Sequence, residues 1–572
     1  MKIQNSVLYC DEMTKTITNR ETEMITKQEP TQPKLWSRFQ DLLSEVALEE
    51  LDRGWQGVFH RMILQQLPIE IMEEKFNKYT GRPTKELYSV CGLLLIMNYF
   101  GWTLSQARLN YMVDLGVQYA LNIEKDAVEL SERTLYRYLD WLRKKDFMQE
   151  AMSLVTECLV KEMDLDLREQ RVDSTHVFSN MASWSRRQLM FNIIRGFLKQ
   201  VRRHANGIYW SLDPELRGRY ERNDGWIFGE TSPMKLQKQG KIYTSEEQLG
   251  YDMEKLIEKF SGNESFCNMT SYKNLVRVFS EQFVDKDGKA ELNPHPGGKI
   301  LLNPSDPDAE IGHKGSGYQV QIAETCSDDN EVQLITAAIP QGASASDMDS
   351  EKLIQEKLKN EGHLPEKLYA DAGYGSDENY VNAAKDGIEL IAPTPHQPEG
   401  KVGLDECKWD DQDRIVECPA GRKPIFKGFK NGKGRAVFFK KICDECPLKD
   451  KCRSKKCGKQ NREFKYSDAD LRTLHRRQLE ATDEFKKQYG SKRSPIEGLN
   501  GRLKQFTPLR RLRIRGRTAV FLSIYAILAM HNIMQLVRYA KIQAKKAAAA
   551  ALFRFFLRNF FGFQLNPLFH AA

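Results

Sequence analysis

The 572-residue sequence predicts an α/β core with a helical domain before it and two inserts, one helical and one a cysteine-rich loop/β segment. Three observations predict this fold class. A single β-type segment, residues 171–178, follows a long helical stretch. Residues 317–391 then alternate between β-type and helical patterns, in an order typical of an α/β sheet. Six of the eleven cysteines lie between residues 407 and 457, in a loop-rich and basic stretch.

The chain is too long for one hydrophobic core, so we divide it where its pattern changes. The core is predicted at 166–182 and 300–395, with C-terminal helices at 467–545. Its strands are expected at 171–178, 317–324, 331–339, 367–371 and 388–391, and its helices at 348–360 and 377–385. The other regions are a loose lead-in (1–59), a helical N-terminal domain (60–165), a helical insert (183–299), a basic cysteine-rich insert (396–466) and a tail (546–572).

Two helix starts stand out in the helical N-terminal domain. Thr103 is placed to cap one helix, and Ser131 begins another that carries Arg133 and Arg137. Helices joined in this way resemble a helix-turn-helix unit that contacts DNA, although many helix pairs have no such function.

The sequence gives no sign of a membrane protein. The N-terminus lacks the apolar segment of a secretory signal. The apolar run 519–537 contains His531, Asn532 and Gln535, which favours a buried helix over a membrane span. The scattered cysteines, including Cys10, are typical free thiols of a reducing compartment. We therefore expect a cytoplasmic protein without a membrane partner.

Positive charge is concentrated in two stretches. Residues 421–465 hold 16 Lys and Arg against 4 Asp and Glu, and residues 486–517 hold 11 against one acid, Glu497. Two concentrated basic surfaces on a chain of net charge +8 indicate a polyanionic partner. Solvated basic loops, or pairing with acids elsewhere in the chain, are the alternatives.

Three acids occupy unusual positions. Asp173 lies within the first β-type segment, where an unpaired carboxylate is unfavourable. Asp371 ends an apolar strand, and ligands of open α/β sheets gather at such strand ends. Glu497 is surrounded by positive charge, which favours an ionised carboxylate that can hold a cation. Each also has a structural explanation: a turn cap, a loop closure, and a capping box with Ser494 and Pro495.

Taken together, the three acids suit phosphodiester chemistry. That chemistry uses two divalent ions, one to activate the attacking oxygen and one to stabilise the leaving oxygen. Mg²⁺ prefers oxygen ligands and keeps several waters, so two or three carboxylates are sufficient.

The segments around these acids resemble the three acidic blocks of bacterial insertion-sequence DDE transposases. The matching segments are Arg171-Val172-Asp173-Ser174-Thr175, Tyr369-Ala370-Asp371-Ala372-Gly373-Tyr374, and residues 493–504. The third block is similar to the Tyr-Arg-Glu-Lys signature of part of that family, with Tyr489, Arg493, Glu497 and Lys504, although three residues rather than two separate its Tyr and Arg. The resemblance covers most of residues 60–540 and is specific in the three blocks.

This resemblance implies a ribonuclease-H-like core and an enzyme that cuts and joins DNA. Asp173, Asp371 and Glu497 would hold two Mg²⁺ or Mn²⁺ ions, and Arg493, Lys504 and Tyr489 would contact DNA near the cut bond. The arginines that follow alternate with apolar residues, so one side of an extended segment would face DNA. They are Arg510, Arg511, Arg513 and Arg515. We expect transposon ends and target DNA as partners, and a homodimer on DNA.

The cysteine cluster has the pattern of a structural zinc site. Cys443 and Cys446 form a Cys-x2-Cys pair, with Cys418 before it and Cys452 after it. These four are the predicted ligands, with Cys457 or Cys407 in reserve. A small insert with little core of its own would gain its order from the metal. Free thiols and disulfides are the alternatives, and the resemblance supports zinc because related transposases carry a similar insert.

Two other functions share these features. A structure-specific nuclease would use the same carboxylates without joining the cut ends. An inactive DNA-binding relic would act as a repressor, but it would have no need to keep all three acids.

Overall fold

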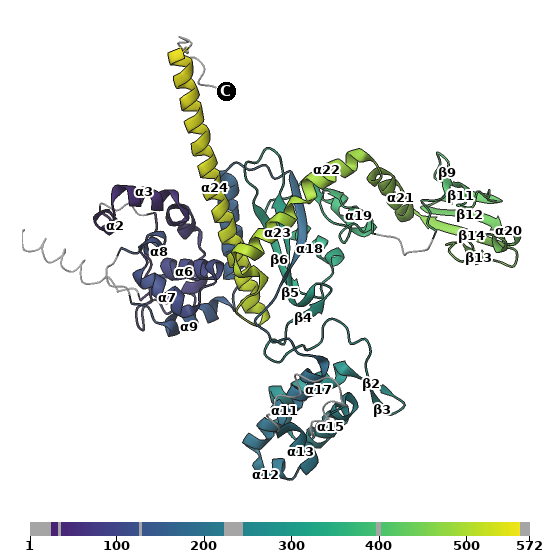
Figure 1. Ribbon diagram of the computed structural model, residues 1–572, viewed down its shortest axis with the longest axis horizontal. Helices are drawn as coiled ribbons and strands as arrows, with labels where there is room; N and C mark the ends of the chain where they lie inside the picture. The colour runs from purple at the N-terminus through teal and green to yellow at the C-terminus, as the bar shows by residue number, and fades with distance from the viewer. Residues whose placement is uncertain (1–23, 32–35, 125–128, 222–243, 396–401, 561–572) are drawn as a thin grey trace, which may run out of the picture.

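The computed structural model describes residues 24–31, 36–124, 129–221, 244–395 and 402–560, with side chains to residue 551. Cys10 therefore lies outside the described residues. Figure 1 shows a central sheet with N-terminal helices on one side and a small second sheet on the other. A separate group of helices projects below the central sheet, and one long helix runs past it (Figure 1).

The central sheet is mixed and contains the strands that the sequence predicted. Its strands are β1 (Glu169–Val177), β4 (Glu310–Gly312), β5 (Gly315–Thr325), β6 (Ile335–Gly342), β7 (Lys367–Tyr369) and β8 (Glu389–Ile391). Strand β5 pairs antiparallel with β1 on one side, and with β6 and β4 on the other. Strands β7 and β8 continue the sheet parallel to β1. The predicted strand and helix order is confirmed, with α18 (Asp347–Asn360) and α19 (Asp377–Lys385) between the last strands.

Helices α18 and α19 cover one face of this sheet. Their apolar side chains share a buried cluster with Val172 of β1 and Leu368 of β7. Each helix starts with a serine cap, Ser346 and Ser376. The strands are buried on both faces, which explains their nearly continuous apolar pattern in the sequence.

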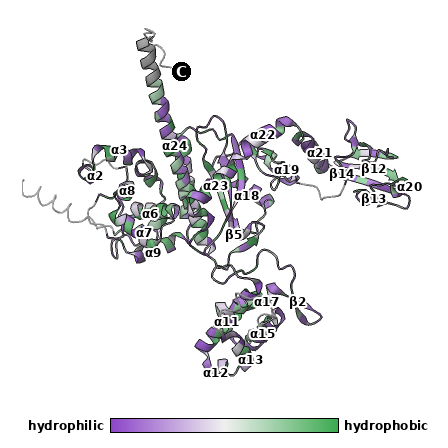
Figure 2. Ribbon diagram, viewed as in Figure 1, coloured by the Kyte–Doolittle hydropathy of each residue, from purple (hydrophilic) through white to green (hydrophobic). Residues whose placement is uncertain are grey.

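The N-terminal helices pack on the other side of the sheet, against the long C-terminal helix. They are α2 (Arg38–Leu42), α3 (Glu45–Arg53), α4 (Trp55–Val58), η1 (Phe59–Ile63), η2 (Leu64–Gln66), α5 (Glu70–Glu73), α6 (Leu87–Phe100), α7 (Leu104–Val113), α8 (Leu115–Ala120), α9 (Glu132–Leu142) and α10 (Phe147–Glu162). Helix α6 is mainly hydrophobic (Figure 2) and is buried over most of its length. The predicted caps Thr103 and Ser131 are confirmed at α7 and α9. The loose lead-in was wrong for residues 38–58, which form helices.

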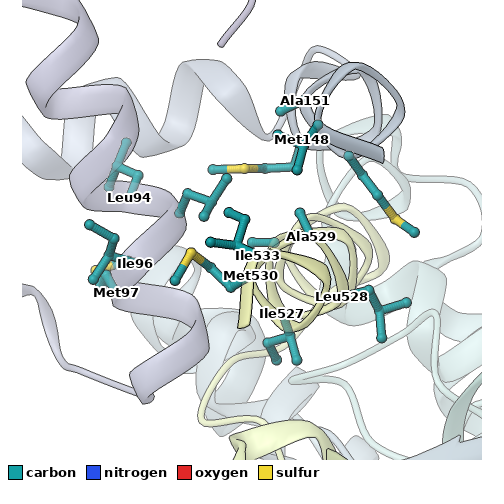
Figure 3. Close-up of a cluster of buried hydrophobic side chains, with 14 of the residues drawn as sticks. Leu94, Ile96, Met97, Met148, Ala151, Ile527, Leu528, Ala529, Met530 and Ile533 are labelled. Atoms are coloured by element: carbon teal, nitrogen blue, oxygen red, sulfur yellow. The ribbon is translucent and has the colours of Figure 1, made fainter. Parts of the chain in front are cut away.

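Helix α24 (Arg517–Phe560) passes through the hydrophobic core between α6 and α10. Figure 3 shows Met530 and Ile533 of α24 facing Leu94 and Met97 of α6. Among the described residues, α24 is the one helix long and apolar enough to cross a membrane, and 78% of its apolar window is buried inside the protein. The predicted buried helix is thus confirmed. The predicted tail was wrong for residues 546–560, since α24 continues through them.

The helical insert has a hydrophobic cluster of its own. It contains α11 (Arg186–His204), α12 (Asn206–Trp210), α13 (Pro214–Glu221), α15 (Glu246–Phe260), α16 (Glu264–Cys267), α17 (Thr270–Gln282) and the hairpin β2 (Phe283–Lys286) to β3 (Lys289–Leu292). Residues such as Phe197, Leu249 and Leu275 are fully buried in it. The insert therefore has a hydrophobic core separate from that of the central sheet.

The cysteine-rich region contains more regular structure than its loop-rich sequence suggested. It consists of β9 (Lys408–Trp409), β10 (Ile415–Glu417), β11 (Phe426–Lys430), β12 (Lys433–Phe439), α20 (Lys440–Asp444), β13 (Lys455–Cys457) and β14 (Asn461–Ser467). Strands β11, β12, β14 and β13 form one antiparallel sheet. The chain then returns to the central sheet through α21 (Asp468–Glu480), α22 (Asp483–Arg493), α23 (Pro495–Phe506) and η4 (Pro508–Arg510).

Candidate active site

Asp173 lies on β1, in the middle of the central sheet, and is only 8% exposed. Its carboxylate accepts hydrogen bonds from the backbone N–H of Ser174 at 2.9 Å and from Nδ2 of Asn500 at 3.0 Å. Burial raises the pKa of Asp173, while the positive charges of Arg493 and Lys314 oppose that rise. Asp173 is therefore a buried acid in a fixed orientation, next to cations.

Asp371 follows the end of β7, where the sheet opens beside Asp173. Strand β7 pairs with β1 only as far as Arg171, so the next residues of β1 have no strand on that side. One carboxylate oxygen of Asp371 accepts a hydrogen bond from the N–H of Gly373 at 2.8 Å. A Cβ at Gly373 would lie 2.9 Å from this oxygen, so the turn requires glycine to approach the carboxylate so closely.

Arg493, the last residue of α22, joins the two aspartates. Its Nη2 lies 3.1 Å from Asp173 Oδ1 and 3.8 Å from Asp371 Oδ2. The residue is 7% exposed, and its Nε and Nη1 atoms have no hydrogen-bond partner within the described residues. The resemblance implied a phosphate contact for Arg493, whereas its ion pairs here are with the two carboxylates. These two donors are buried, so Arg493 carries unsatisfied hydrogen-bonding capacity beside the two carboxylates.

Glu497 is exposed in the first turn of α23. The capping-box alternative is wrong, because Ser494 is helical and its side chain does not cap α23. Glu497 precedes Asn500 by three residues on α23, so the two lie on neighbouring turns of one side of the helix, although Asn500 is buried and Glu497 is exposed. Among the described residues, no group of three or more His, Cys, Asp or Glu is arranged to hold a metal ion. The structure thus brings Asp173 and Asp371 together but does not gather Glu497 with them, since Asn500 makes the contact from α23.

A fourth acid, Asp347, lies beside the pair and escaped the sequence analysis. Asp347, the first residue of α18, accepts hydrogen bonds from Ser174 Oγ at 3.3 Å and from Gln321 Nε2 at 2.9 Å. A Cβ at Gly373 would lie 3.5 Å from Asp347 Oδ2 and 2.9 Å from Asp371 Oδ1, so both carboxylates border the same space beside Gly373. An Asp after a serine cap reads as ordinary helix capping, so no sequence signal distinguishes it.

The pKa of Tyr374 reflects the closeness of Asp347, Asp173 and Asp371. Tyr374 is fully buried, and its hydroxyl donates a hydrogen bond to Gln321 Oε1. Burial raises the pKa of Tyr374, and the charges of Asp347, Asp173 and Asp371 raise it further. All three acids are therefore within electrostatic reach of one side chain.

Tyr489 supports the strand end rather than facing solvent. Its hydroxyl donates a hydrogen bond to the carbonyl of Ala370 at 3.0 Å, and its ring stacks on Phe485 at 5.6 Å. The polar end of Tyr489 is thus used inside the protein, in contrast to the DNA contact that the resemblance implied.

The arginine segment crosses the end of β1. The N–H of Phe178 donates to the carbonyl of Arg510 at 3.1 Å, and the N–H of Leu512 donates to the carbonyl of Phe178 at 2.8 Å. Leu512 is buried, while Arg511 and Arg513 are exposed. The predicted alternation is confirmed at these positions. Arg515 is different: its Nε donates to the carbonyl of Asn180 at 2.6 Å, so its guanidinium is partly used by the protein.

Two lysines lie next to the acids. Lys504, predicted from the sequence, is half-buried on α23. Lys314, which the sequence analysis missed, lies in the turn between β4 and β5. Its Nζ donates to the carbonyl of Ser174 at 3.2 Å and to the hydroxyl of Ser174 at 3.0 Å. A lysine in a glycine-rich loop has no pattern that marks it as part of a site.

The four predicted zinc ligands line one small cavity in the cysteine-rich region. Its volume is about 30 Å³, which is the size of a single small ligand, and Phe438 and Phe464 form its apolar wall. Burial raises the pKa of Cys443, and neighbouring thiols, first Cys452, raise it further. No cysteine of the described residues forms a disulfide. Cys407 is buried nearby, while Cys457 approaches Arg435 instead. The cavity-lining set is Cys418, Cys443, Cys446 and Cys452.

A protein-family profile described as "Transposase DDE domain" matches residues 417–537. The matched segment runs from β10 through the cysteine-rich sheet to the middle of α24, and it includes Arg493, Glu497 and Lys504. No curated protein and no solved structure matches the chain. The match supports a transposase function and a nucleic-acid-cleaving enzyme that uses divalent metal ions, with DNA as its substrate.

Proposed function

We propose that this chain is an insertion-sequence transposase of the DDE type, which cuts transposon ends and joins them to target DNA. One observation carries the proposal. Asp173 and Asp371 come from neighbouring strands to a single arginine, and that arginine, Arg493, belongs to the segment that the transposase profile matches. Two carboxylates at the open end of a sheet, beside a basic surface, suit phosphodiester transfer.

The strand order supports a ribonuclease-H-like core. The order β6–β5–β1–β7–β8, with β5 antiparallel to β1 and with β7 and β8 parallel to it, places the end of β7 beside the middle of β1, where Asp173 lies. The helical insert between β1 and β5 and the cysteine-rich insert before α21 leave this sheet uninterrupted.

The donors at the site fit Mg²⁺ or Mn²⁺, which prefer oxygen ligands. Asp173 and Asp371 would hold the ions, and Glu497 would add a third carboxylate from the helical face it shares with Asn500. Two bound ions would activate the attacking oxygen and stabilise the leaving oxygen. Asn500 and the backbone of Ser174 hold Asp173 in place, and Arg493 keeps the two aspartates at the same opening.

DNA would lie along the basic surface at the end of β1. Arg511 and Arg513 project from the segment that pairs with Phe178, while Lys504 and Arg510 lie between them and Asp173. A guanidinium can donate two hydrogen bonds to one phosphate, which suits a surface that holds the backbone. Joining two ends requires two active sites, so we propose a homodimer on DNA, in the cytoplasm.

We also propose one structural Zn²⁺ in the cysteine-rich region. Four thiols around one cavity are the donor set that zinc prefers, and a tetrahedral site of four cysteines leaves no position open for catalysis. The bound ion would join Cys418, directly after β10, to Cys443 of α20 and to the segment that follows α20. Its role would be folding, and it would take no part in DNA cleavage.

The test is a two-part assay with DNA that flanks the gene. Purified protein should cut the flanking ends only when Mg²⁺ or Mn²⁺ is added, and it should then join the cut ends to a plasmid. Cutting without joining would identify a nuclease. Binding without cutting, at any metal concentration, would identify an inactive DNA-binding protein and overturn the proposal.

A further inference from the structure

Lys314 reaches from the β4–β5 turn to the unpaired side of β1. Two of the three donors of its ammonium group contact Ser174, through the carbonyl and the hydroxyl. Ser174 directly follows Asp173, so Lys314 is anchored one residue from a predicted metal ligand. The third donor remains for a ligand, and no carboxylate of the described residues forms an ion pair with Lys314.

The turn is shaped to bring this lysine close. Gly315 and Gly317 have φ angles of +129° and +130°, which side chains rarely allow. A Cβ on Gly315 would lie 3.2 Å from the ring of Phe178 and 3.4 Å from His176 Nε2. Glycine at this position therefore lets the turn lie against the end of β1, where Lys314 can fold back to Ser174.

Lys504 and Arg510 approach the same place from the other side. Lys504 is one helical turn beyond Asn500, which contacts Asp173. Arg510 is fixed by the hydrogen bond from the N–H of Phe178 to its carbonyl. Burial lowers the pKa of Lys504, and the charges of Lys314 and Arg510 lower it further against the opposing effect of Asp173. Neither Lys504 nor Arg510 forms an ion pair with a described acid.

His176 lies beside Lys314 and Lys504 but contributes no charge of its own to this group of cations. His176 Nε2 contacts the carbonyl of Ser316 at 3.2 Å. Burial lowers the pKa of His176, and Lys504, Lys314 and His313 lower it further. The imidazole is thus neutral near pH 7. The carboxylates nearest the group are Asp173 and Asp347, and Asp347 accepts a hydrogen bond from the same Ser174 hydroxyl that Lys314 contacts.

Three cations gathered without paired acids repel each other, and an anion between them removes that repulsion. We propose that Lys314, Lys504 and Arg510 together bind one backbone phosphate of DNA, beside Asp173. This inference rests on the proposed function, and it adds a residue, Lys314, and a place for the phosphate. A phosphodiester fits because it carries one negative charge and two oxygens that accept hydrogen bonds from ammonium and guanidinium groups.

The proposed position of the phosphate gives a role to the contact between Lys314 and Ser174 of β1. A phosphate held by Lys314 would lie along the edge of β1 toward Asp173 and Asp371. The same ammonium group that orients Ser174 would then fix the DNA backbone relative to the carboxylates. A positioning contact of this kind acts on DNA binding before any bond is cut.

The test measures the binding of a short duplex DNA of arbitrary sequence, without added divalent metal, by fluorescence anisotropy over a series of KCl concentrations. Loss of one phosphate contact makes the log–log salt slope shallower by about 0.9. Lys314→Gln and Lys504→Gln should each make it shallower. The double variant should lose about 0.9 in total, because both lysines hold the same phosphate. Lys314→Arg should keep the slope of the unmodified protein.

Lys352→Gln is the matched control, because Lys352 is an exposed lysine on α18, and it should leave the slope unchanged. Thermal unfolding of each variant shows whether the fold is kept. An unchanged slope in Lys314→Gln would overturn the inference, with or without a loss of stability. A double variant whose slope becomes shallower by clearly more than about 0.9 would also overturn it, because more than one phosphate contact would then be lost. The assay needs no cleavage, so the phosphate site can stand if the transposase proposal fails, and it can fail while end cleavage succeeds.

Discussion

The carboxylate site and the cysteine cluster are both proposed to hold metal ions, but they are built from different parts of the chain. Asp173 and Asp371 lie far apart in the sequence and meet because a fully buried sheet brings their strands together. The four cysteines lie close together in the sequence, within a region that has a small hydrophobic cluster of its own. The carboxylates are bridged by a buried arginine, whereas the thiols line a small cavity with two phenylalanines and with Arg422, Lys449 and Arg462.

This difference separates the two roles. The sheet holds the aspartates in place by packing and by Arg493, so the site keeps its shape and stays open to a substrate. The cysteine-rich region is small, and small regions need a metal or a disulfide to stay folded. We therefore expect metal removal to stop chemistry at the first site and to unfold the second.

The largest expected effect is at the aspartates. Asp173→Asn and Asp371→Asn should each reduce end cleavage roughly 10⁴-fold or more, because a lost ligand removes the ion that does the chemistry. DNA binding should change little, because basic residues supply most of the affinity. Cleavage assays with end-containing DNA, alongside gel-shift binding, measure both effects. Asp349→Asn, two residues from Asp347 and exposed, is the control; cleavage by either active-site variant at the control's rate would remove that residue from the metal site.

The next prediction compares how much cleavage depends on Glu497 and on Asp347. Glu497→Gln should abolish cleavage if Glu497 completes the metal site. Asp347→Asn should lower cleavage roughly 10- to 100-fold, as expected for a residue that orients a ligand through Ser174. Single-turnover cleavage rates give the ranking. The opposite ranking would assign the third ligand to Asp347, and it would leave Glu497 as an exposed acid at the start of α23.

Zinc content is the test for the cysteine-rich region. Elemental analysis should find one zinc per chain in the purified protein and none in Cys443→Ser. Apparent zinc-binding free energies of such sites are on the order of 10 kcal/mol, so the variant should lose the structure of this region. Limited proteolysis should then cut between residues 402 and 475 while the central sheet stays resistant. Protein purified without zinc, and equally resistant there, would contradict the proposal.

The pH dependence of the free energy of unfolding tests the burial of Glu351, which packs beside the central sheet. Glu351 is a fully buried residue of α18, and burial raises its pKa to about 7. Because the folded-state pKa lies above the ordinary value, the sheet should be most stable below about pH 4.5 and should lose stability as pH rises through 7. Glu351→Gln should remove this loss, which is roughly 3 kcal/mol between pH 5 and pH 8. Urea unfolding of both proteins at the two pH values measures it, and parallel pH profiles would show that Glu351 titrates normally.

The smallest effect is expected at the exposed arginines. Arg511→Gln combined with Arg513→Gln should weaken binding to DNA of any sequence and make the salt slope shallower by up to about 0.9 for each lost phosphate. Arg515→Gln should have less effect, because its guanidinium already contacts the carbonyl of Asn180. Salt titrations of the three variants distinguish these outcomes. An equal effect of Arg515→Gln would show that this contact is released on DNA.

Periodicity predicted the sheet well because its strands are buried on both faces and its helices carry serine caps. It also predicted Asp173 and Asp371, since an acid inside or after an apolar strand is conspicuous. It missed Asp347 and Lys314, whose roles depend on contacts across the fold with Ser174. The family resemblance assigned Tyr489 and Arg493 to DNA, which stays a prediction; it did not indicate their contacts within the protein, with Ala370 and with Asp173 and Asp371. Sequence patterns report local burial, and these contacts are set by the register of strands that are distant in the chain.

The central claim is that Asp173 and Asp371 share divalent metal ions. Anomalous diffraction from crystals of the protein soaked in Mn²⁺ tests it directly, because the scattering locates the ion independently of activity. We predict a Mn²⁺ peak in contact with carboxylate oxygens of both Asp173 and Asp371, and its loss in Asp173→Asn. A protein that cleaves DNA at the same Mn²⁺ concentration, but whose crystals show no peak between these two residues, would contradict the account.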